Sequence, residues 1–458
     1  MLISLEIFGL RGFATPQTLS FALPNGELGS GLTVLVGANN AGKSTAIEAL
    51  RAISQRRNPS FTQGRRNQMA GDLVSIKVVG ADGKSTVLQS IRPGSSETEF
   101  VKEDGGIDFS RLLILPSRRV FNPYFGRAEH DRSQYIANTD FPAIRASSFD
   151  QFTHRLFTVE KNRADFDAIL SRVLDPVPNW SIDQMDTGQY FLKFKKGDAT
   201  HSSEGLGEGL VSLLYIIDAL YDSKDGDTIA IDEPELSLHP ALQRKLSSLL
   251  IEYAATRQII ISTHSPYFAR LDALPNGATV ARAHVVGDES RISQMSSSTA
   301  QALFGLMRNQ NNPHVLGLNA QEIFFIEDRV ILVEGQEDVV FFQRVQEDLG
   351  TLTGSFFGWG VGGAENMQII ATLLLEIGFS KVVGILDGNR TELAHALAEK
   401  FPSYHFFSIP ADDVRTKKAV ASRPAVTGLL DDENLKVRPE HIGQVVRLFD
   451  EANNYLRN

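Results

Sequence analysis

The chain has 458 residues, a formal net charge of −10, 22% charged and 42% hydrophobic residues, and no cysteine. Its length predicts two or three domains, and its acidic balance argues against a protein that coats nucleic acid indiscriminately, because such binding requires broad neutralisation of phosphates. The absence of cysteine excludes a disulfide scaffold, and the absence of a signal-peptide layout and of uncharged long apolar runs predicts a cytoplasmic protein that does not enter membranes.

The N-terminal segment reads as short strands that lead to a glycine-rich loop. Strands are predicted at 2–8 and 18–21, and a buried strand is predicted at 32–36. The following residues, GANNAGKST, match the pattern G-x-x-x-x-G-K-[ST] in every fixed position and stand between a predicted strand and a predicted helix. This pattern predicts a phosphate-binding loop.

The composition of this loop suits a polyphosphate. Gly37 and Gly42 allow backbone N–H groups to turn inward where a Cβ would obstruct them. We expect Lys43 to lie against the β- and γ-phosphates and Ser44 to offer its hydroxyl to Mg²⁺, at the positive end of the next helix. The nucleotide-binding residues predicted here are Gly37, Asn39, Asn40, Gly42, Lys43, Ser44 and Thr45.

An arginine-rich stretch follows the first predicted helix. Two interpretations stay open, a loop that touches nucleic acid or a partner's phosphates and a solvated face. The arginines are Arg51, Arg56, Arg57, Arg65 and Arg66.

Strands are then predicted at 73–79, 86–91 and 112–115. Residues from 120 to about 175 have a mostly helical pattern without sustained heptads, so no long coiled-coil arm is expected.

A second group of motifs begins with HSSEGLGEGL at His201, where Ser and Gly precede a helix and suit an anion-binding N-terminus. A short apolar strand at 228–231 then ends in Asp232 and Glu233, where an acidic pair can meet Mg²⁺. We expect Asp232 to hold the metal through water. Glu233 is expected to orient and deprotonate the attacking water.

A further buried strand at 258–262 delivers His264 to the same predicted sheet edge. A single histidine after a strand is usually structural. This histidine follows a phosphate loop and an acidic strand end, so His264 is predicted to sense a γ-phosphate.

The order of GANNAGKST, SSEGLGEGL, TIAIDEPELSLHP and ISTHSP resembles an ABC-type ATPase head of the SMC and recombination-ATPase kind. The resemblance spans roughly residues 1 to 300. It implies a mixed α/β head that forms a head-to-head dimer, in which Ser203 and Gly205 of one subunit close over ATP held by Lys43 of the other.

The chain departs from that pattern at two places. Glu204 and Glu208 put negative charge in the signature motif, and Ser237-Leu238-His239 replaces the more usual small-residue loop after the catalytic glutamate. No Gln-loop residue is evident, and Gln151 is a candidate.

The last third of the chain predicts a separate domain. A polar break at 309–313 divides the chain into a head at 1–308, with a helical insertion at about 120–175, a linker at 309–328 and a second domain at 329–458. Strands predicted at 330–333, 381–386 and 404–409 alternate with helices, as in a small, mostly parallel α/β sheet.

Acidic residues follow these last strands. Carboxylates at the ends of neighbouring parallel strands share one sheet edge, as a Mg²⁺ site requires, although such residues also serve as turn residues and helix caps. The candidate ligands are Glu334, Asp338, Asp387 and Asp413.

The pattern VEGQED followed by LDGN resembles a TOPRIM domain, and an ATPase head joined to such a domain resembles the OLD family of prokaryotic antiviral ATP-dependent nucleases. The TOPRIM pattern expects Asp-x-Asp, whereas this chain has Asp387-Gly388-Asn389. Asparagine brings no negative charge, so the affinity of this edge for a metal ion is expected to fall.

Three functions therefore stay open. The first is a sensor and scaffold that resembles the ATPase component of PARIS-type antiviral systems and holds a separate toxin nuclease until a phage trigger arrives. The second is an ATP-gated, Mg²⁺-dependent endonuclease that acts through its own TOPRIM-like domain. The third, a DNA-repair recombination ATPase, explains the head but not the tail. The expected cofactors are ATP and Mg²⁺, and the expected partners are a second copy of the chain, a nuclease or toxin, and nucleic acid or a phage trigger.

Overall fold

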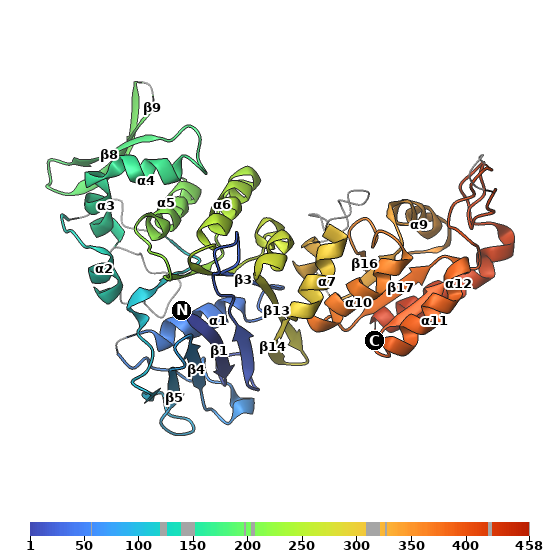
Figure 1. The fold of residues 1–458 in the computed structure, drawn as a ribbon, viewed down its shortest axis with the longest axis horizontal. Coiled ribbons are helices and arrows are strands. Elements are labelled where there is room, and N and C mark those ends of the chain that lie inside the picture. Colours follow the sequence, from blue (N-terminus) through green and yellow to red (C-terminus); the bar gives the residue numbers. More distant parts are fainter. Residues whose placement is uncertain are drawn as a thin grey trace. The chain divides into compact units, whose positions relative to one another are not determined.

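The chain folds into two compact units, Met1–Ile292 and Ser293–Asn458 (Figure 1). The coordinates are a computed structural model. They describe residues 1–55, 57–119, 126–138, 152–196, 198–202, 207–307, 321–325, 328–419 and 424–457.

The division between the units differs from the predicted boundary after residue 308. Helix α7 (Ser297–Met307) belongs to the second unit, because it packs against α10 (Met367–Glu376). The carboxylate of Glu376 accepts hydrogen bonds from the Ser296 backbone N–H and from the Thr299 hydroxyl, at 2.8 Å each, and so fixes the start of α7. Most of the predicted linker lies outside the described residues.

A six-stranded sheet in the order β14-β13-β3-β12-β11-β7 forms the centre of the first unit. The pairs from β13 to β7 are all parallel, so the carboxyl ends of these strands meet at one edge. Strands β3, β11 and β12 are buried along their whole length, which explains their unbroken apolar sequences. The bounds are β3 (Leu32–Val36), β7 (Leu112–Leu115), β11 (Thr228–Asp232), β12 (Gln258–Ser262), β13 (Thr279–Val286) and β14 (Glu289–Gln294).

A second, antiparallel sheet lies on the other side of helix α1 (Lys43–Ile53) in the order β2-β1-β4-β5-β6. Ile47 and Leu50 of α1 share one apolar core with Ile7 of this sheet and Ile260 of the parallel sheet. The helix that begins at the phosphate loop is therefore held from both sides. The bounds are β1 (Leu2–Phe8), β2 (Gln17–Ser20), β4 (Ser75–Gly80), β5 (Ser85–Ser90) and β6 (Thr98–Glu103).

The described part of the region between β7 and β11 contains three helices, then a three-stranded antiparallel sheet in the order β10-β9-β8, and then helix α5. The sequence pattern predicted the helices but not this sheet. Arg155, which is 1% exposed, binds Asp218 at 3.0 Å and Asp222 at 2.6 Å, and so anchors α3 on α5. The bounds are α2 (Arg132–Asn138), α3 (Phe152–Lys161), α4 (Arg163–Leu170), β8 (Asn179–Gln184), β9 (Tyr190–Lys196), β10 (Ala199–Ser202), α5 (Glu208–Tyr221) and α6 (Pro240–Tyr253).

The second unit is built on a parallel sheet in the order β16-β15-β17-β18. This sheet and the helix-covered sheets of the first unit confirm the predicted α/β fold class. The bounds are β15 (Val330–Val333), β16 (Ser355–Phe356), β17 (Val382–Leu386), β18 (His405–Ser408), α9 (Gln336–Leu349), α11 (Thr391–Lys400) and α12 (Pro439–Arg457). Short 3-10 helices are η1 (Gln68–Ala70), η2 (Phe109–Arg111), η4 (Pro266–Phe268), η5 (Leu271–Asn276), η6 (Ile323–Phe325), η7 (Ala364–Asn366) and η8 (Gly388–Arg390).

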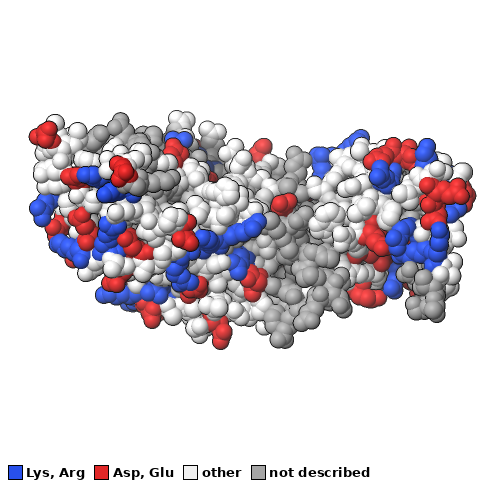
Figure 2. All heavy atoms as spheres, turned by 90° about the horizontal axis from the view of Figure 1, so that it is seen from above, with Lys and Arg blue, Asp and Glu red and all other residues white. Residues whose placement is uncertain are grey.

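Charged side chains of both signs are interspersed over the face drawn in Figure 2. In the arginine-rich stretch, Arg66 donates to the carbonyl oxygen of Phe61 at 2.8 Å, and Arg65 lies 3.6 Å from Glu48. These contacts favour a structural role for the two residues, while Arg56 lies outside the described residues. None of the helices in the described ranges is long and apolar enough to span a bilayer.

Candidate functional site

The loop between β3 and α1 has a backbone path that requires glycine at two positions. Gly37 has φ of 137° and Gly42 has φ of 111°. A Cβ on Gly37 would lie 2.0 Å from the carbonyl oxygen of Ala283, and one on Gly42 would lie 2.8 Å from the ring of Phe13. Both predicted glycines are thus needed for the loop to fit its own surroundings.

The other predicted loop residues divide between the surface and the core. Asn39 and Asn40 are exposed at the tip of the loop, and Asn40 has φ of 60°, a conformation that asparagine tolerates better than most residues. Thr45 is buried in the first turn of α1.

Lys43 turns its ammonium group into the loop. Its Nζ donates to the carbonyl oxygens of Gly37 and Ala38, both at 2.9 Å, and lies 3.5 Å from Nδ1 of His264. Burial lowers the pKa of Lys43 to about 8, against the opposing charges of Glu233 and Asp232. The desolvated cation therefore stands where the predicted phosphates would lie.

Asp232 lies at the end of β11 and faces the start of α1. Its Oδ1 accepts a hydrogen bond from the Ser44 hydroxyl at 3.3 Å, and the Ser262 hydroxyl donates to the same oxygen. Asp232 is 5% exposed, and burial raises the pKa of its carboxyl group. The register that pairs Asp232 with Ser262 explains why these groups meet.

The oxygens of Ser44 and Asp232 fit Mg²⁺, which favours oxygen ligands and keeps substrate phosphates and waters as its remaining ligands. Within the described ranges, no three histidine or acidic side chains converge to hold a metal ion by themselves. The pair beside the phosphate loop would therefore share such an ion with the substrate.

Glu233 and His264 lie next to this pair. Glu233 has φ of 50°, a strained conformation for glutamate, and its Oε1 lies 3.9 Å from Nε2 of His264. Burial, assisted by the charge of Lys43, lowers the pKa of His264 to about 4. The imidazole is therefore neutral at pH 7, with one nitrogen as donor and the other as acceptor.

No sequence signal singled out Glu235, which supports the loop that carries His264. Its Oε1 accepts from the His264 backbone N–H at 2.5 Å, and its Oε2 accepts from the Thr263 hydroxyl at 2.8 Å. Burial raises the pKa of the Glu235 carboxyl group. The motif places Glu235 after Asp232 and Glu233, but only the fold reveals its partners.

Arg119 is a second residue that the motifs did not identify. It follows β7 and is 3% exposed. Its guanidinium donates to the Ser212 hydroxyl at 2.8 Å and to the Pro116 carbonyl oxygen at 2.7 Å. It also donates to the carbonyl oxygens of Asp232 and Glu233, each at 2.8 Å. Burial lowers the pKa of Arg119 to about 10, so it remains charged at neutral pH.

The predicted signature motif is only partly described. Ser203, Gly205 and the Gln-loop candidate Gln151 lie outside the described residues. The two departures from the family pattern contact each other, because Ser237 donates from its hydroxyl to Glu208 at 3.1 Å.

In the second unit, the four predicted acids lie along the edge where β15, β17 and β18 end. Glu334 accepts from the Asp387 backbone N–H at 3.0 Å, and Asp338 accepts from the Gly335 backbone N–H at 2.7 Å. Burial, together with the charges of Glu334, Asp338 and Asp413, raises the pKa of Asp387 to about 8. Burial likewise raises the pKa of Asp338 to about 6.

Several side chains at this edge already have hydrogen-bond or ion-pair partners. Asp413 pairs with Lys417 and accepts from the Arg415 backbone N–H at 3.0 Å. Asn389, which stands where an acidic residue was expected, donates from its amide to the Asp412 carbonyl oxygen at 3.1 Å. The asparagine thus fixes the loop after β18.

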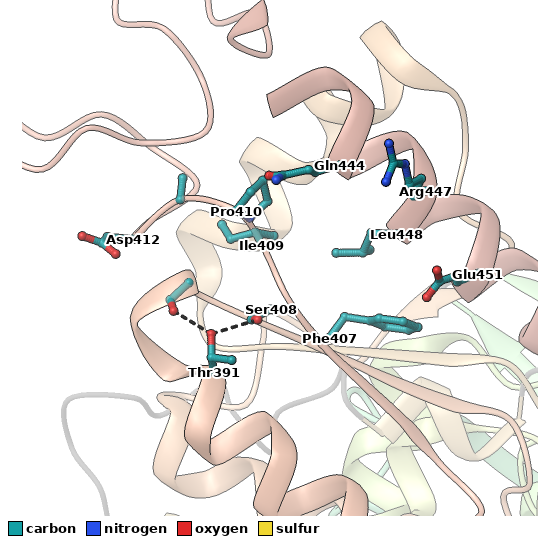
Figure 3. Close-up of a pocket in the computed structure, with 12 residues that line it drawn as sticks. Thr391, Phe407, Ser408, Ile409, Pro410, Asp412, Gln444, Arg447, Leu448 and Glu451 are labelled. Atoms are coloured by element: carbon teal, nitrogen blue, oxygen red, sulfur yellow. Dashed lines mark hydrogen bonds between the residues drawn. The ribbon is translucent and has the colours of Figure 1, made fainter. Parts of the chain in front are cut away.

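A cavity of about 520 Å³ lies beside the same loop. Figure 3 shows Phe407 and Leu448 at its apolar side, with Arg447 and Glu451 at its rim. The cavity and the acidic edge share the segment from Ile409 to Asp412.

Two family models match the first unit. One, described as "AAA domain, putative AbiEii toxin, Type IV TA system", matches residues 103–270, and another, described as "AAA domain", matches residues 4–164. A solved structure of an SMC head bound to the C-winged helix domain of ScpA aligns with a TM-score of 0.42 and 13% identity, over 66% of this chain and 99% of that chain.

Three curated proteins are similar in sequence. The chain is 24% identical to the Septu protein PtuA of Bacillus thuringiensis over 280 residues, which cover 53% of this chain and 68% of the relative. It is 33% identical to the OLD nuclease of Thermus scotoductus over 310 residues, or 53% of this chain and 57% of the relative. It is 27% identical to endonuclease GajA of Bacillus cereus over 186 residues, or 39% of this chain and 30% of the relative. The site geometry, the AAA models and these relatives together identify the chain as an ATPase that resembles the OLD-type proteins.

Proposed function

We propose that this chain is the ATP-hydrolysing sensor and scaffold of a prokaryotic anti-phage defence system, and that it controls a separate toxin nuclease. The observation that carries the ATPase part is the gathering of Lys43, Asp232, Glu233 and His264 at one edge of the parallel sheet. The similarity to the Septu, OLD and GajA proteins supports the setting in defence.

Binding of ATP would use the loop between Gly37 and Gly42. Lys43 would exchange its two carbonyl partners for oxygens of the β- and γ-phosphates, which are stronger acceptors because they are charged. Ser44 and Asp232 would hold Mg²⁺, whose charge offsets that of the phosphates when it is bound.

Hydrolysis would use Glu233 as the base. Its carboxylate would take a proton from a water molecule as the water oxygen bonds to the γ-phosphorus and the bond to ADP breaks. The neutral His264, 3.9 Å from Glu233, would contact the γ-phosphate through a ring nitrogen and so distinguish ATP from ADP. Glu235 would keep the backbone of His264 in place.

Completion of the site would require a second copy of the chain. We propose that Ser203 and Gly205 of one subunit close over the ATP held by Lys43 of another, in a head-to-head dimer. ATP binding would then assemble the dimer and hydrolysis would release it, which provides a two-state element for a sensor.

The second unit is proposed to be a docking or assembly platform. The hydrogen bond from Asn389 to Asp412 and the ion pair between Asp413 and Lys417 give these side chains structural partners, as expected of turn and pairing residues. The toxin nuclease would be a separate protein.

The alternative is an ATP-gated, Mg²⁺-dependent endonuclease, and one observation favours it. The pKa of Asp387 is raised to about 8 by burial and by three neighbouring carboxylates, and a bound cation would relieve that repulsion. The OLD nuclease and endonuclease GajA among the relatives support this alternative as well.

One experiment tests both parts. Purified protein is incubated with plasmid DNA or total RNA, ATP and Mg²⁺ or Mn²⁺, beside Lys43→Ala and Asp387→Ala variants. The proposal expects ATP turnover that Lys43→Ala abolishes, and no cleavage by the wild type. Cleavage that Asp387→Ala abolishes would replace the scaffold with the endonuclease, and equal ATP turnover in the Lys43→Ala variant would refute the ATPase site.

A further inference from the structure

Arg119 connects three segments that converge behind the proposed catalytic site. It extends from the segment after β7, donates to Ser212 in the second turn of α5, and donates to the carbonyl oxygens of Asp232 and Glu233. Both Arg119 and Ser212 are buried, at 3% and 5% exposure, so water cannot readily replace these hydrogen bonds.

We propose that Arg119 is a positioning residue that couples α5 to Glu233 of the same subunit. This inference rests on the proposed ATPase, because α5 follows directly after the signature segment that would contact the ATP of the second copy. Closure of the dimer over one ATP would then act, through α5, Ser212 and Arg119, on the catalytic glutamate of the other site.

The backbone at Glu233 needs such support. Its φ of 50° is sparsely populated for a residue with a side chain, and such a conformation persists only where several contacts determine it. The Glu233 backbone N–H donates to the Ser262 carbonyl oxygen at 2.8 Å, and Arg119 donates to the carbonyl oxygens of Asp232 and Glu233. A shift of Arg119 would therefore move the peptide that aims the Glu233 carboxylate.

A second contact restricts how α5 can move. The Ser237 hydroxyl binds Glu208 in the first turn of α5, and a Cβ on Gly209 would lie 2.2 Å from the Ser237 carbonyl oxygen. The start of α5 thus packs directly on the segment that follows Glu233, so a displacement of the helix cannot be absorbed there. Arg119 and Ser237 hold the Glu233 segment from both sides.

The test uses Ser212→Ala, which removes the acceptor on α5 and leaves the three carbonyl partners of Arg119 in place. We expect kcat for ATP to fall by ~10- to ~100-fold, because a small misplacement of a reacting group has effects of this size. The ATP concentration at half saturation should change less than ~2-fold, since Ser212 does not touch the phosphate loop. Arg119→Lys, which retains the charge but not the forked donors, should give the same pattern.

Ser247→Ala is the matched control, because Ser247 is also a buried serine of a helix, α6, and has 2% exposure. Single-turnover assays in a Glu233→Gln background separate coupling from general damage. If Ser212 acts through Glu233, Ser212→Ala has no further effect in that background.

Wild-type kcat in Ser212→Ala and Arg119→Lys would overturn the inference, and so would a full additional loss in the Glu233→Gln background. Failure of the ATPase proposal itself gives a different result, equal turnover by the wild type and by Lys43→Ala.

Discussion

The hydroxyl of Ser44 donates to the carboxylate of Asp232 across 3.3 Å, although 188 positions separate the two residues in the chain. The parallel sheet brings them together, because β3 leads into the helix that carries Ser44 and β11 ends at Asp232, with only β12 between the two strands. The magnesium-binding function proposed for this pair therefore depends on the strand order and not only on the local motifs.

Removal of the Lys43 ammonium group should abolish ATP binding. Lys43→Ala leaves the phosphates without their buried cationic partner, and a loss of ~100-fold or more in affinity is expected for a group of this kind. Titration with a fluorescent ATP analogue measures it. Lys245→Ala, at an exposed lysine on α6, is the control and should bind as the wild type does. Retention of affinity within ~3-fold in Lys43→Ala would contradict the assigned role.

Glu233→Gln should trap an ATP-bound dimer. The amide preserves the size of the side chain but cannot accept the proton of the attacking water, so turnover should fall by ~100- to ~10,000-fold. ATP binding should persist because Lys43, Ser44 and Asp232 are unchanged. Size-exclusion chromatography with light scattering, with and without ATP and Mg²⁺, measures the dimer. Glu252→Gln, at a glutamate that pairs with Arg172 on the surface, should remain a wild-type control. A monomer in saturating ATP would refute the dimer.

The motifs were sufficient to locate much of this site. Strands β3, β11 and β12 are continuous apolar runs between glycine-rich or acidic segments, so their pattern indicates both where they lie and where they end. Asp232 is the last residue of β11, and Lys43 and His264 come after the ends of β3 and β12. The shared edge follows from the parallel arrangement.

The supporting contacts were not predictable from spacing. Arg119 and Ser212 are 93 positions apart, and an arginine after a strand is ordinarily solvated, so only the packing of α5 shows their hydrogen bond. The strand β9 was missed because Tyr190–Lys196 mixes aromatic residues and lysines without a clear alternation. The boundary before α7 was missed because the polar segment at 309–313 is a stronger turn signal than the chain before Ser297.

The lowered pKa of His264 predicts a pH-dependent stability. The unfolded chain, with an ordinary histidine pKa near 6.5, binds a proton that the folded chain excludes until the pH falls to about 4. The free energy of unfolding should therefore decrease as the pH falls from about 6.5 to about 4, by ~1–3 kcal/mol from this group.

Comparison with His264→Gln isolates that contribution, because glutamine does not titrate. In denaturant titrations, the free energy of unfolding of the wild type should decrease relative to that of the variant as the pH is lowered from 7 to 5. A pH-independent difference would show that His264 is as easily protonated in the folded chain as in the unfolded one.

The raised pKa of Asp387 predicts that its contribution to stability decreases as the pH rises, which is opposite to the effect of His264. The folded chain, with a pKa of about 8 for this carboxyl group, retains a proton that the unfolded chain has released above pH 4. The stability contribution of Asp387 is therefore lost progressively as the pH rises to about 8. Asp387→Asn removes the titrating group, so the thermal midpoint of the variant should rise relative to that of the wild type between pH 5 and pH 8.5 in the presence of EDTA.

Addition of Mg²⁺ at pH 8.5 then separates the two proposed roles of the second unit. If this edge is a platform whose side chains serve as caps and ion pairs, 5 mM Mg²⁺ without nucleotide should leave the difference between wild type and Asp387→Asn unchanged. If it is a nuclease site, the cation should bind the ionised carboxylates and stabilise the wild type alone, since the amide of Asn389 is held by Asp412 and Asp387 is the central carboxylate of the edge. A shift of the wild-type midpoint that Asp387→Asn abolishes would thus favour the endonuclease, and it can be measured without any substrate for cleavage.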